Sequence, residues 1–262
     1  MRLLNLFKYL ILVTLLSGCT DDQPIQVNTW RIDMGLGLEK PIRALYIADI
    51  HYREGQTVFD ELLQIAKDTQ PDLILLGGDY TGMGAIDTDR LRDFMVNELS
   101  RLSQEAPTFA VLGNHEDYTF LYQWIQTLVR SPIRLSEGHE DMLTIRGVNV
   151  CIRGLGDTYT GNYLHVPFSK DCSDLKLTLT HDPYAVQIDP ETGLYLAGHT
   201  HCGQVKLPLI KPFWTPSEAS QDYWCGYGRD GDKQWITSSG VGTTFMDVRI
   251  GATSSVELVE MY

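Results

Sequence analysis

Five short motifs along the chain combine glycine with side chains that can bind metal ions. They are Asp49-Ile50-His51, Gly77-Gly78-Asp79, Gly113-Asn114-His115-Glu116, Leu179-Thr180-His181 and Gly198-His199-Thr200-His201. These motifs hold five of the seven histidines of the protein. Carboxylate, imidazole and carboxamide donors without thiolate suit Mn, Fe or Zn better than Ca or a structural zinc site. The sequence therefore predicts a site for divalent transition metals.

Each motif falls where an apolar run breaks into a turn, at the expected end of a strand. Residues two apart in a strand point to the same side. We therefore expect Asp49 and His51 to bind one ion together, and His199 and His201 to do the same. Glycine beside such ligands permits sharp turns and leaves room for a substrate. Each motif alone is an ordinary turn, and only the set of five indicates a metal centre.

Apolar strands alternate with amphipathic helices in the first half of the chain. We expect strands at 44–48, 73–76 and 108–112, and helices at 57–67, 89–102 and 118–130. This order favours parallel strands with helices on their faces. After Pro132, short strands are expected near Arg134, Leu143, Val148, Lys176, Leu194, Gln204, Trp235, Met246 and Val256. The pattern predicts an α/β fold of two packed sheets flanked by helices, with a long irregular loop over 207–231.

The ordered set of motifs resembles the calcineurin-like metallophosphoesterase family from about Arg43 to the C-terminus. The runs at 198–204 and 239–244 resemble a bacterial subgroup of the YaeI/YkuE type. Cys202 departs from that pattern, where glycine is more usual. The resemblance implies a four-layer αββα sandwich, with two packed mixed sheets flanked by helices, over a metallophosphoesterase domain of residues 41–262.

The resemblance also assigns roles by position. It implies a first ion held by Asp49, His51 and His201, a second held by Asn114, His181 and His199, and Asp79 bridging both. His115 would not be a ligand and would act as the catalytic side chain over the substrate phosphate. A water or hydroxide bridging two divalent metal ions (Mn, Fe or Zn) would attack a phosphodiester or pyrophosphate bond in line. A phosphodiesterase is favoured.

Other functions remain open at this point. The alternatives are a phosphomonoesterase, a UDP-2,3-diacylglucosamine-type pyrophosphate hydrolase, a non-enzymatic lipoprotein that binds metal or a phosphorylated ligand, and a structural envelope protein. His139 and His165 match no motif and are interpreted as surface or loop histidines. Four aromatic residues of the long loop either line a substrate pocket or pack the loop: Trp214, Tyr223, Trp224 and Tyr227.

The composition restricts the partners. The formal charge is −13 and the sequence pI is near 4.8. Avid binding to nucleic acid needs clustered Lys and Arg, so no nucleic-acid binding is expected. A small phosphorylated or lipid-linked substrate remains compatible, because bound metal ions supply positive charge locally.

The first residues read as an export signal rather than as part of the fold. Arg2 and Lys8 precede an uncharged apolar run, and residues 16–19, Leu-Ser-Gly-Cys, resemble a bacterial lipobox. We expect a signal peptide at 1–18, a lipidated Cys19, and a tether and N-terminal segment at 19–40. The protein would then be lipid-anchored to a membrane of the cell envelope and face the periplasm. The alternative is an uncleaved membrane helix.

Four further cysteines lie in the expected domain: Cys151, Cys172, Cys202 and Cys225. In an oxidising compartment they allow zero to two disulfides, and the sequence does not choose among the three complete pairings. No Cys-x-x-Cys spacing is present, so neither a thiolate zinc site nor a redox motif is expected.

Overall fold

A computed structural model describes residues 24–82, 88–206, 212 and 214–262. The predicted signal peptide and Cys19 lie outside these residues. None of the helices among these residues has the length and hydrophobicity of a transmembrane span.

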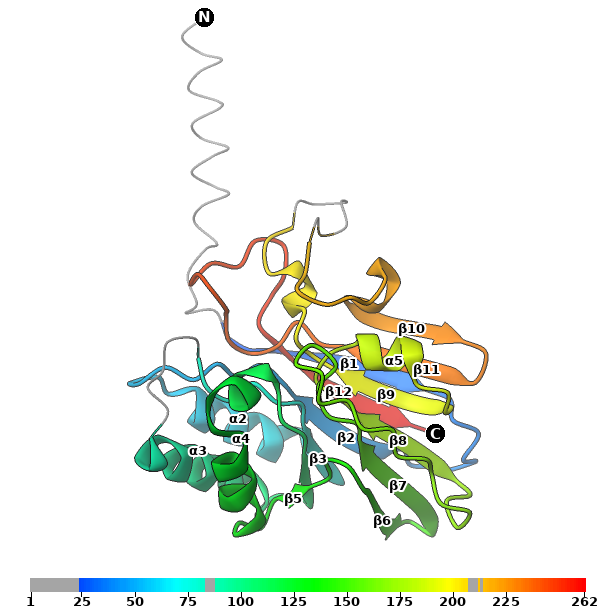
Figure 1. The fold of residues 1–262 in the computed structure, drawn as a ribbon. Coiled ribbons are helices and arrows are strands. Elements are labelled where there is room, and N and C mark those ends of the chain that lie inside the picture. Colours follow the sequence, from blue (N-terminus) through cyan, green and yellow to red (C-terminus); the bar gives the residue numbers. More distant parts are fainter. Residues whose placement is uncertain (1–23, 83–87, 207–211, 213) are drawn as a thin grey trace, which may run out of the picture.

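The first sheet is mixed and carries three helices on its outer face (Figure 1). Its strand order is β1 (Gln26–Ile32), β12 (Ser255–Met261), β2 (Ile42–Ile47), β3 (Leu73–Leu76), β4 (Thr108–Ala110) and β5 (Arg134–Leu135). All neighbours are parallel except β12 and β2. The covering helices are α2 (Val58–Thr69), α3 (Asp89–Leu102) and α4 (Asn114–Val129). The predicted strand–helix alternation thus forms a parallel unit.

The second sheet is also mixed and packs against the first. Its order is β10 (Gly226–Asp230), β11 (Lys233–Thr237), β9 (Gly193–Ala197), β8 (Leu175–Leu179), β7 (Val148–Gly154) and β6 (Glu140–Ile145). Its outer face carries α5 (Tyr184–Ile188), and two 3-10 turns follow, η1 (His201–Gly203) and η2 (Gln221–Tyr223). The fourth layer is therefore thin, since α5 has only five residues.

Alternating side chains of the central strands supply both hydrophobic cores. On β2, Leu45 and Ile47 face the helices, whereas Ala44 and Tyr46 face the second sheet. Strands buried on both faces read as continuous apolar runs, as β3 does. The predicted architecture of two packed mixed sheets with flanking helices is confirmed.

Three element predictions need correction. The tether and N-terminal segment predicted at 19–40, outside the domain of 41–262, contains β1, which pairs along its whole length with β12 in the first sheet. The predicted loop over 207–231 contains β10, which pairs with β11. The strands expected near Gln204 and Met246 are absent from the described residues, where η1 and an isolated bridge at Val205 occur instead.

Helix α4 begins four residues earlier than the predicted helix. Gly113 is its N-cap, and the Glu116 carboxylate accepts the Gly113 N–H at 2.9 Å. This capping interaction starts the helix at Asn114, because it satisfies a backbone donor that the first turn leaves free. Asn114 and His115 therefore lie on the first turn of a helix rather than at a strand end.

The four cysteines form two disulfides in the structure. Cys151 pairs with Cys172 across a Cα–Cα distance of 5.9 Å, and Cys202 pairs with Cys225 across 4.8 Å. The first ties β7 to the end of the segment 155–173, and the second ties η1 to the start of β10.

A buried ion pair holds the segment 155–173 against the second sheet. Arg153 on β7 donates to Asp189 at 2.6 Å, and both side chains are fully buried. Asp189 also accepts from the Tyr163 hydroxyl at 2.9 Å and faces His165 Nδ1 at 3.1 Å. Burial alone would raise the pKa of Asp189, but hydrogen bonds from Arg153 and Tyr195 hold it below its usual range.

We expect Asp189→Asn to lower the free energy of unfolding by about 3–5 kcal/mol, because it leaves the Arg153 guanidinium buried without its counter-charge. Folding depresses the pKa of Asp189, so its ionised carboxylate adds to the free energy of unfolding above pH about 4. This contribution is lost as the pH falls further. Urea unfolding at pH 7 and pH 3 measures both effects. Asp171→Asn is the control, because Asp171 is exposed. An equal decrease in the free energy of unfolding in the two variants would contradict the prediction.

Candidate metal centre

The carboxyl ends of five strands meet at one edge of the two sheets, and the motifs follow them. Asp49 and His51 follow β2, Asp79 follows β3, Asn114 follows β4, His181 follows β8, and His199 and His201 follow β9. Open α/β sheets bind ligands in the crevice outside the carboxyl ends of their strands. The structure brings all seven predicted ligands together there.

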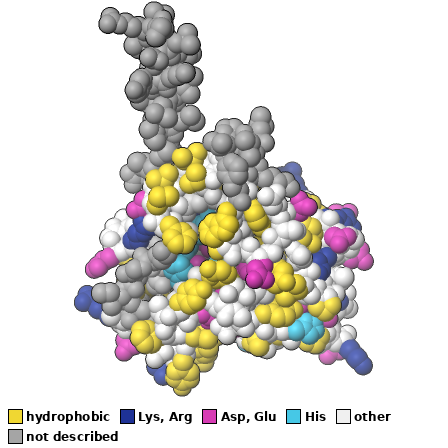
Figure 2. Space-filling view, turned by 45° about the horizontal axis from the view of Figure 1, so that its top comes forward, with side chains coloured by type: hydrophobic (Ala, Val, Ile, Leu, Met, Phe, Trp, Pro, Cys, Tyr) yellow, Lys and Arg dark blue, Asp and Glu magenta, His cyan; other side chains and the backbone are white. Residues whose placement is uncertain are grey.

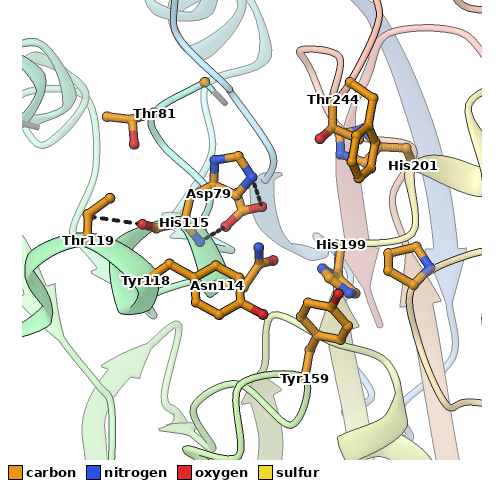
Figure 3. A pocket seen from close by; sticks show the side chains of 13 residues that line it. Asp79, Thr81, Asn114, His115, Tyr118, Thr119, Tyr159, His199, His201 and Thr244 are labelled. Atoms are coloured by element: carbon orange, nitrogen blue, oxygen red, sulfur yellow. Dashed lines mark hydrogen bonds and ion pairs between the residues drawn. The ribbon is translucent and has the colours of Figure 1, made fainter. Parts of the chain in front are cut away.

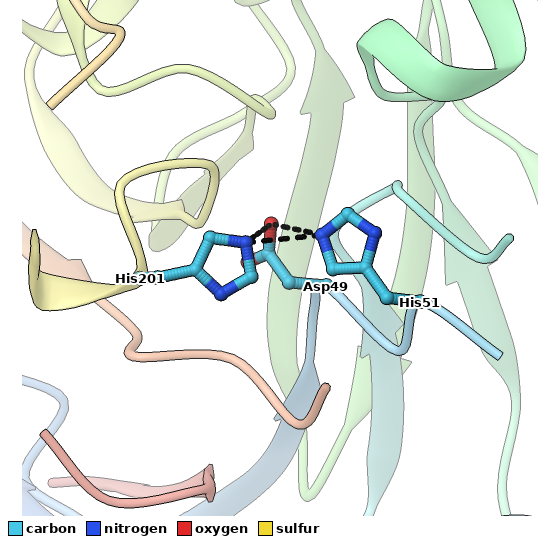
Figure 4. A group of neighbouring side chains, drawn as sticks. All are labelled: Asp49, His51 and His201. Atoms are coloured by element: carbon cyan, nitrogen blue, oxygen red, sulfur yellow. Dashed lines mark hydrogen bonds and ion pairs between the residues drawn. The ribbon is translucent and has the colours of Figure 1, made fainter. Parts of the chain in front are cut away.

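A first group consists of Asp49, His51 and His201 (Figure 4). The Nε2 atoms of His51 and His201 lie 3.0 Å apart, and His201 Nε2 lies 3.6 Å from Asp49 Oδ1. All three residues are buried. Donor atoms this close together can share one ion at the usual ligand distances of about 2.0–2.2 Å.

A second group consists of Asp79, His181 and His199, with Asn114 beside them. His181 Nε2 lies 3.3 Å from Asp79 Oδ2 and 3.1 Å from Asn114 Oδ1. The buried Nε2 of His199 has no hydrogen-bond partner within the described chain. A metal ion would satisfy this atom, so the residues present fit a second ion.

Asp79 lies between the two groups. Its Oδ2 is 3.6 Å from His51 Nε2 and 3.3 Å from His181 Nε2. Its Oδ1 accepts the backbone N–H of His115 at 2.9 Å, which fixes the carboxylate. This is the position that a bridging ligand requires.

Backbone carbonyls orient two of the imidazoles. His181 Nδ1 lies 2.8 Å from the Gly77 carbonyl oxygen, and His51 Nδ1 lies 3.3 Å from that of Thr81. A protonated Nδ1 donating to these carbonyls leaves Nε2 free to bind an ion, which is the usual arrangement around metal sites.

Burial is the largest cause of three pKa shifts in the cluster, whereas for His181 burial would lower the pKa but the nearby carboxylates, chiefly that of Asp79, raise it overall. Burial raises the pKa of Asp49 to about 7, although the charge of His181 opposes this. It lowers the pKa of His51 to about 3 and that of His199 to about 4. Both imidazoles are therefore held neutral, the form that binds metal. A divalent cation would in turn stabilise the ionised carboxylates.

The expectation that His199 and His201 bind one ion together is wrong, because they fall in different groups. The expected strand geometry is also wrong for Asp49 and His51, although these two residues share a group. Strand β2 ends at Ile47 and β9 ends at Ala197, so the ligands lie beyond them. Five predicted ligands have a left-handed backbone with φ between 45° and 64°: Asp49, His51, Asp79, His199 and His201. Such strain persists only where the surrounding contacts impose it, and it clusters at functional sites.

Backbone hydrogen bonds and one close glycine impose this geometry. His51 N–H donates to the Asp79 carbonyl at 3.0 Å, and His199 N–H donates to Asp49 Oδ1 at 3.0 Å. Gly240 has a φ of 72°, and a Cβ on it would lie 2.5 Å from Asp49 Cβ. No residue with a side chain fits there without displacing Asp49.

A cavity of about 340 Å³ opens above the predicted ligands (Figure 3). His115 lines it, with Nε2 3.8 Å from Asp79 Oδ2 and a side chain that is 12% exposed. The walls include Tyr118, Tyr159, Pro216, Thr244 and Phe245. His115 therefore stands where it can contact a bound substrate.

The remaining predicted residues lie elsewhere. His139 is exposed on a turn, and His165 contacts Asp189. None of the four loop aromatics is among the residues that line this cavity. Tyr223 stacks on Trp235, Tyr227 stacks on Trp30, the Trp224 indole donates to the Ala219 carbonyl, and Trp214 is exposed.

Sequence reasoning missed the aromatic walls and the role of Glu116. Tyr159 reaches the site from the segment 155–173 and packs 4.7 Å from the His199 ring, a long-range contact that no local pattern indicates. Glu116 accepts the backbone N–H groups of Asp79 and Tyr80, each at 2.9 Å. The capping spacing from Gly113 to Glu116 was a usable signal for this residue.

Comparison with known proteins agrees with this geometry. The family model described as calcineurin-like phosphoesterase matches residues 42–203. The chain is 28% identical over 230 residues to Phosphodiesterase YaeI of Escherichia coli (strain K12), covering 84% of this chain and 82% of that protein. It is 30% identical over 251 residues to the uncharacterized metallophosphoesterase YkoQ of Bacillus subtilis (strain 168), covering 88% of each.

A solved structure shares the fold. It is GAP50, the anchor in the inner membrane complex of Plasmodium, with a TM-score of 0.50 and 12% identity, covering 84% of this chain and 80% of that one. Identity this low supports the fold alone. The family match spans more than half of the chain and contains all seven predicted ligands. The protein therefore belongs to the calcineurin-like phosphoesterase family.

Proposed function

We propose that the protein is a phosphoric ester hydrolase with a dinuclear metal centre and that phosphodiesters are its substrates. The observation that carries this proposal is the place of Asp79, between two buried donor groups and below a cavity lined by His115. The similarity to Phosphodiesterase YaeI supports the choice of a diester. The donor set suits Mn, Fe or Zn.

The chain's own residues would hold the ions, orient the substrate and move the leaving-group proton. Asp49, His51 and His201 would bind one ion, and Asn114, His181 and His199 the other, with Asp79 shared. Two divalent cations supply a water of lowered pKa and polarise the phosphoryl oxygens. His115 faces the cavity and is placed to stabilise the phosphoryl charge or to protonate the leaving oxygen.

Glu116 holds two segments that carry predicted site residues, the turn after β3 and the start of α4. Its carboxylate accepts three backbone N–H groups, from Asp79, Tyr80 and Gly113, each at 2.9 Å. It thereby holds the turn of Asp79 against the first turn of α4, which carries Asn114 and His115. Rigid orientation of this kind keeps the reacting groups in place without reorganisation.

We also propose that the protein is lipid-anchored through Cys19 in the cell envelope, facing the periplasm. The apolar leader and the Leu-Ser-Gly-Cys run support this, as do two disulfides, which persist in oxidising compartments. The substrate would be a small phosphorylated or lipid-linked molecule, because an acidic chain does not favour nucleic acid.

We expect the Mn²⁺-loaded protein to hydrolyse bis-p-nitrophenyl phosphate faster than p-nitrophenyl phosphate and to lose this activity in EDTA. His115→Ala should lower kcat for the diester by about 10²- to 10⁴-fold, because it removes the group that stabilises or protonates the leaving oxygen. Release of p-nitrophenol measures both effects.

His139→Ala is the matched control, since His139 is exposed and lies outside the cavity. It should leave kcat unchanged. Faster hydrolysis of the monoester would favour a phosphomonoesterase instead. No turnover of either ester by folded, metal-loaded protein would favour the binding-only alternative.

We expect two bound metal ions per chain, as measured by elemental analysis after dialysis against metal-free buffer. His201→Ala removes a ligand of the first group only, so the second ion should remain. Asp79→Ala removes the shared ligand and should weaken the retention of both ions. Retention of a single ion by the unmodified protein would refute the dinuclear centre, whereas His139→Ala should retain the full complement.

A further inference from the structure

Exposed apolar side chains surround the mouth of the catalytic cavity. We define the rim as Tyr118, Tyr159, Trp214, Phe245 and Met246, which are 65%, 43%, 65%, 66% and 59% exposed. Tyr118, Tyr159 and Phe245 also line the cavity. Figure 2 shows hydrophobic side chains gathered on this face around histidine. Contiguous exposed apolar groups around a site mark a contact surface.

Two described segments hold the remaining members of the rim beside the site. Trp214 lies between Pro212, which packs on Gly203 of η1, and Pro216, which lines the cavity. The carbonyl of Met246 accepts from Gln204 Nε2 at 3.0 Å. Both segments are thus tied to the turn that follows His201.

The start of β1 lies at the same edge as the predicted ligands. Gln26 pairs with Ser255, whose N–H donates to the Gly240 carbonyl at 3.0 Å. Gly240 in turn abuts Asp49. The first described residues, 24 and 25, therefore lie at the edge that carries the catalytic cavity and the rim.

The length of chain before β1 limits how far this edge can lie from an anchor. The segment from Cys19 to Pro24 can extend at most about 18 Å. A lipid on Cys19 would therefore hold the metal-binding edge, rather than the opposite edge, next to the membrane.

We propose that the rim docks on the surface of the phospholipid bilayer, so that the catalytic cavity opens toward the lipid headgroups. This inference rests on the anchored phosphoesterase proposed above. Tyr and Trp favour the membrane–water interface, where one end of the side chain is apolar and the other hydrated. The formal charge of −13 does not favour electrostatic attraction to anionic lipid, so apolar contact with zwitterionic lipid is the expected mode.

Fluorescence quenching tests the docking. The mature protein, lipidated on Cys19, is incorporated into vesicles of phosphatidylethanolamine and phosphatidylcholine, with and without brominated acyl chains. Trp214 is exposed, whereas Trp124 and Trp235 are buried and Trp30 and Trp224 are half-buried. We expect quenching in the brominated vesicles and loss of most of it in Trp214→Phe.

A pair of matched variants tests the rim itself. Phe245→Ser removes an apolar side chain that is 66% exposed at the rim, and Val129→Ser removes one that is 65% exposed at the far end of α4. Phe245→Ser should reduce the quenching, and Val129→Ser should leave it unchanged. Equal quenching in all variants, or none in the vesicle-bound protein, would mean that the anchor alone holds the protein and would overturn the proposal.

Hydrolysis of bis-p-nitrophenyl phosphate by the same samples separates the two proposals. Quenching without metal-dependent turnover would support the docking surface and refute the proposed catalysis. Turnover without quenching would support the catalysis and refute the docking surface.

Discussion

One carboxylate, that of Asp79, faces two groups of candidate metal ligands at once, and this position constrains the arrangement of both sheets. Asp79 comes from the centre of the first sheet, whereas His181 and His199 come from the second. Both sheets must therefore present the carboxyl ends of their strands at the same edge. The hydrophobic core between them achieves this, because side chains of both sheets, such as Tyr46 on β2 and Leu177 on β8, belong to one buried cluster. Burial of so many ionisable groups is costly unless opposite charge compensates for it.

The same constraint explains the strained backbone and the hydrogen bonds around it. Left-handed conformations at Asp49 and Asp79 bring their carboxylates into the space between the sheets. Glu116 stabilises this geometry through three backbone N–H groups, and burial raises its pKa to about 8, partly through the nearby charge of Asp79. The ionised form of Glu116 therefore depends on positive charge in the adjacent cluster. A cation bound in that cluster would supply this charge, so that metal binding would stabilise the ionised Glu116 and the backbone that it holds.

Much of the fold, and the motifs that the structure brings together at one edge of the sheets, could be predicted because their signals are local. The helix at 89–102 matches α3, whose buried side chains repeat at helical spacing. Strand β1 was missed because its pattern is mostly polar and its partner, β12, lies 229 residues away along the chain. The disulfide pairs and the contact of Tyr159 with His199 depend on tertiary proximity in the same way. No spacing within the sequence encodes such contacts.

The predicted ligands and the cavity walls are held by different means. Apart from Asn114 on α4, the predicted ligands lie in short turns after strands, and apart from Tyr118 on α4, the named wall residues lie in irregular segments. Asp182, the residue after His181, connects two of these segments, because it accepts from Thr158 at 2.6 Å and from Ser217. One wall carries Tyr159, and the other carries Pro216. Changes in these segments can therefore reshape the cavity while the turn that carries His181 stays in place. Such a separation lets one metal centre serve different substrates, because specificity then resides in walls that the ligand motifs do not encode.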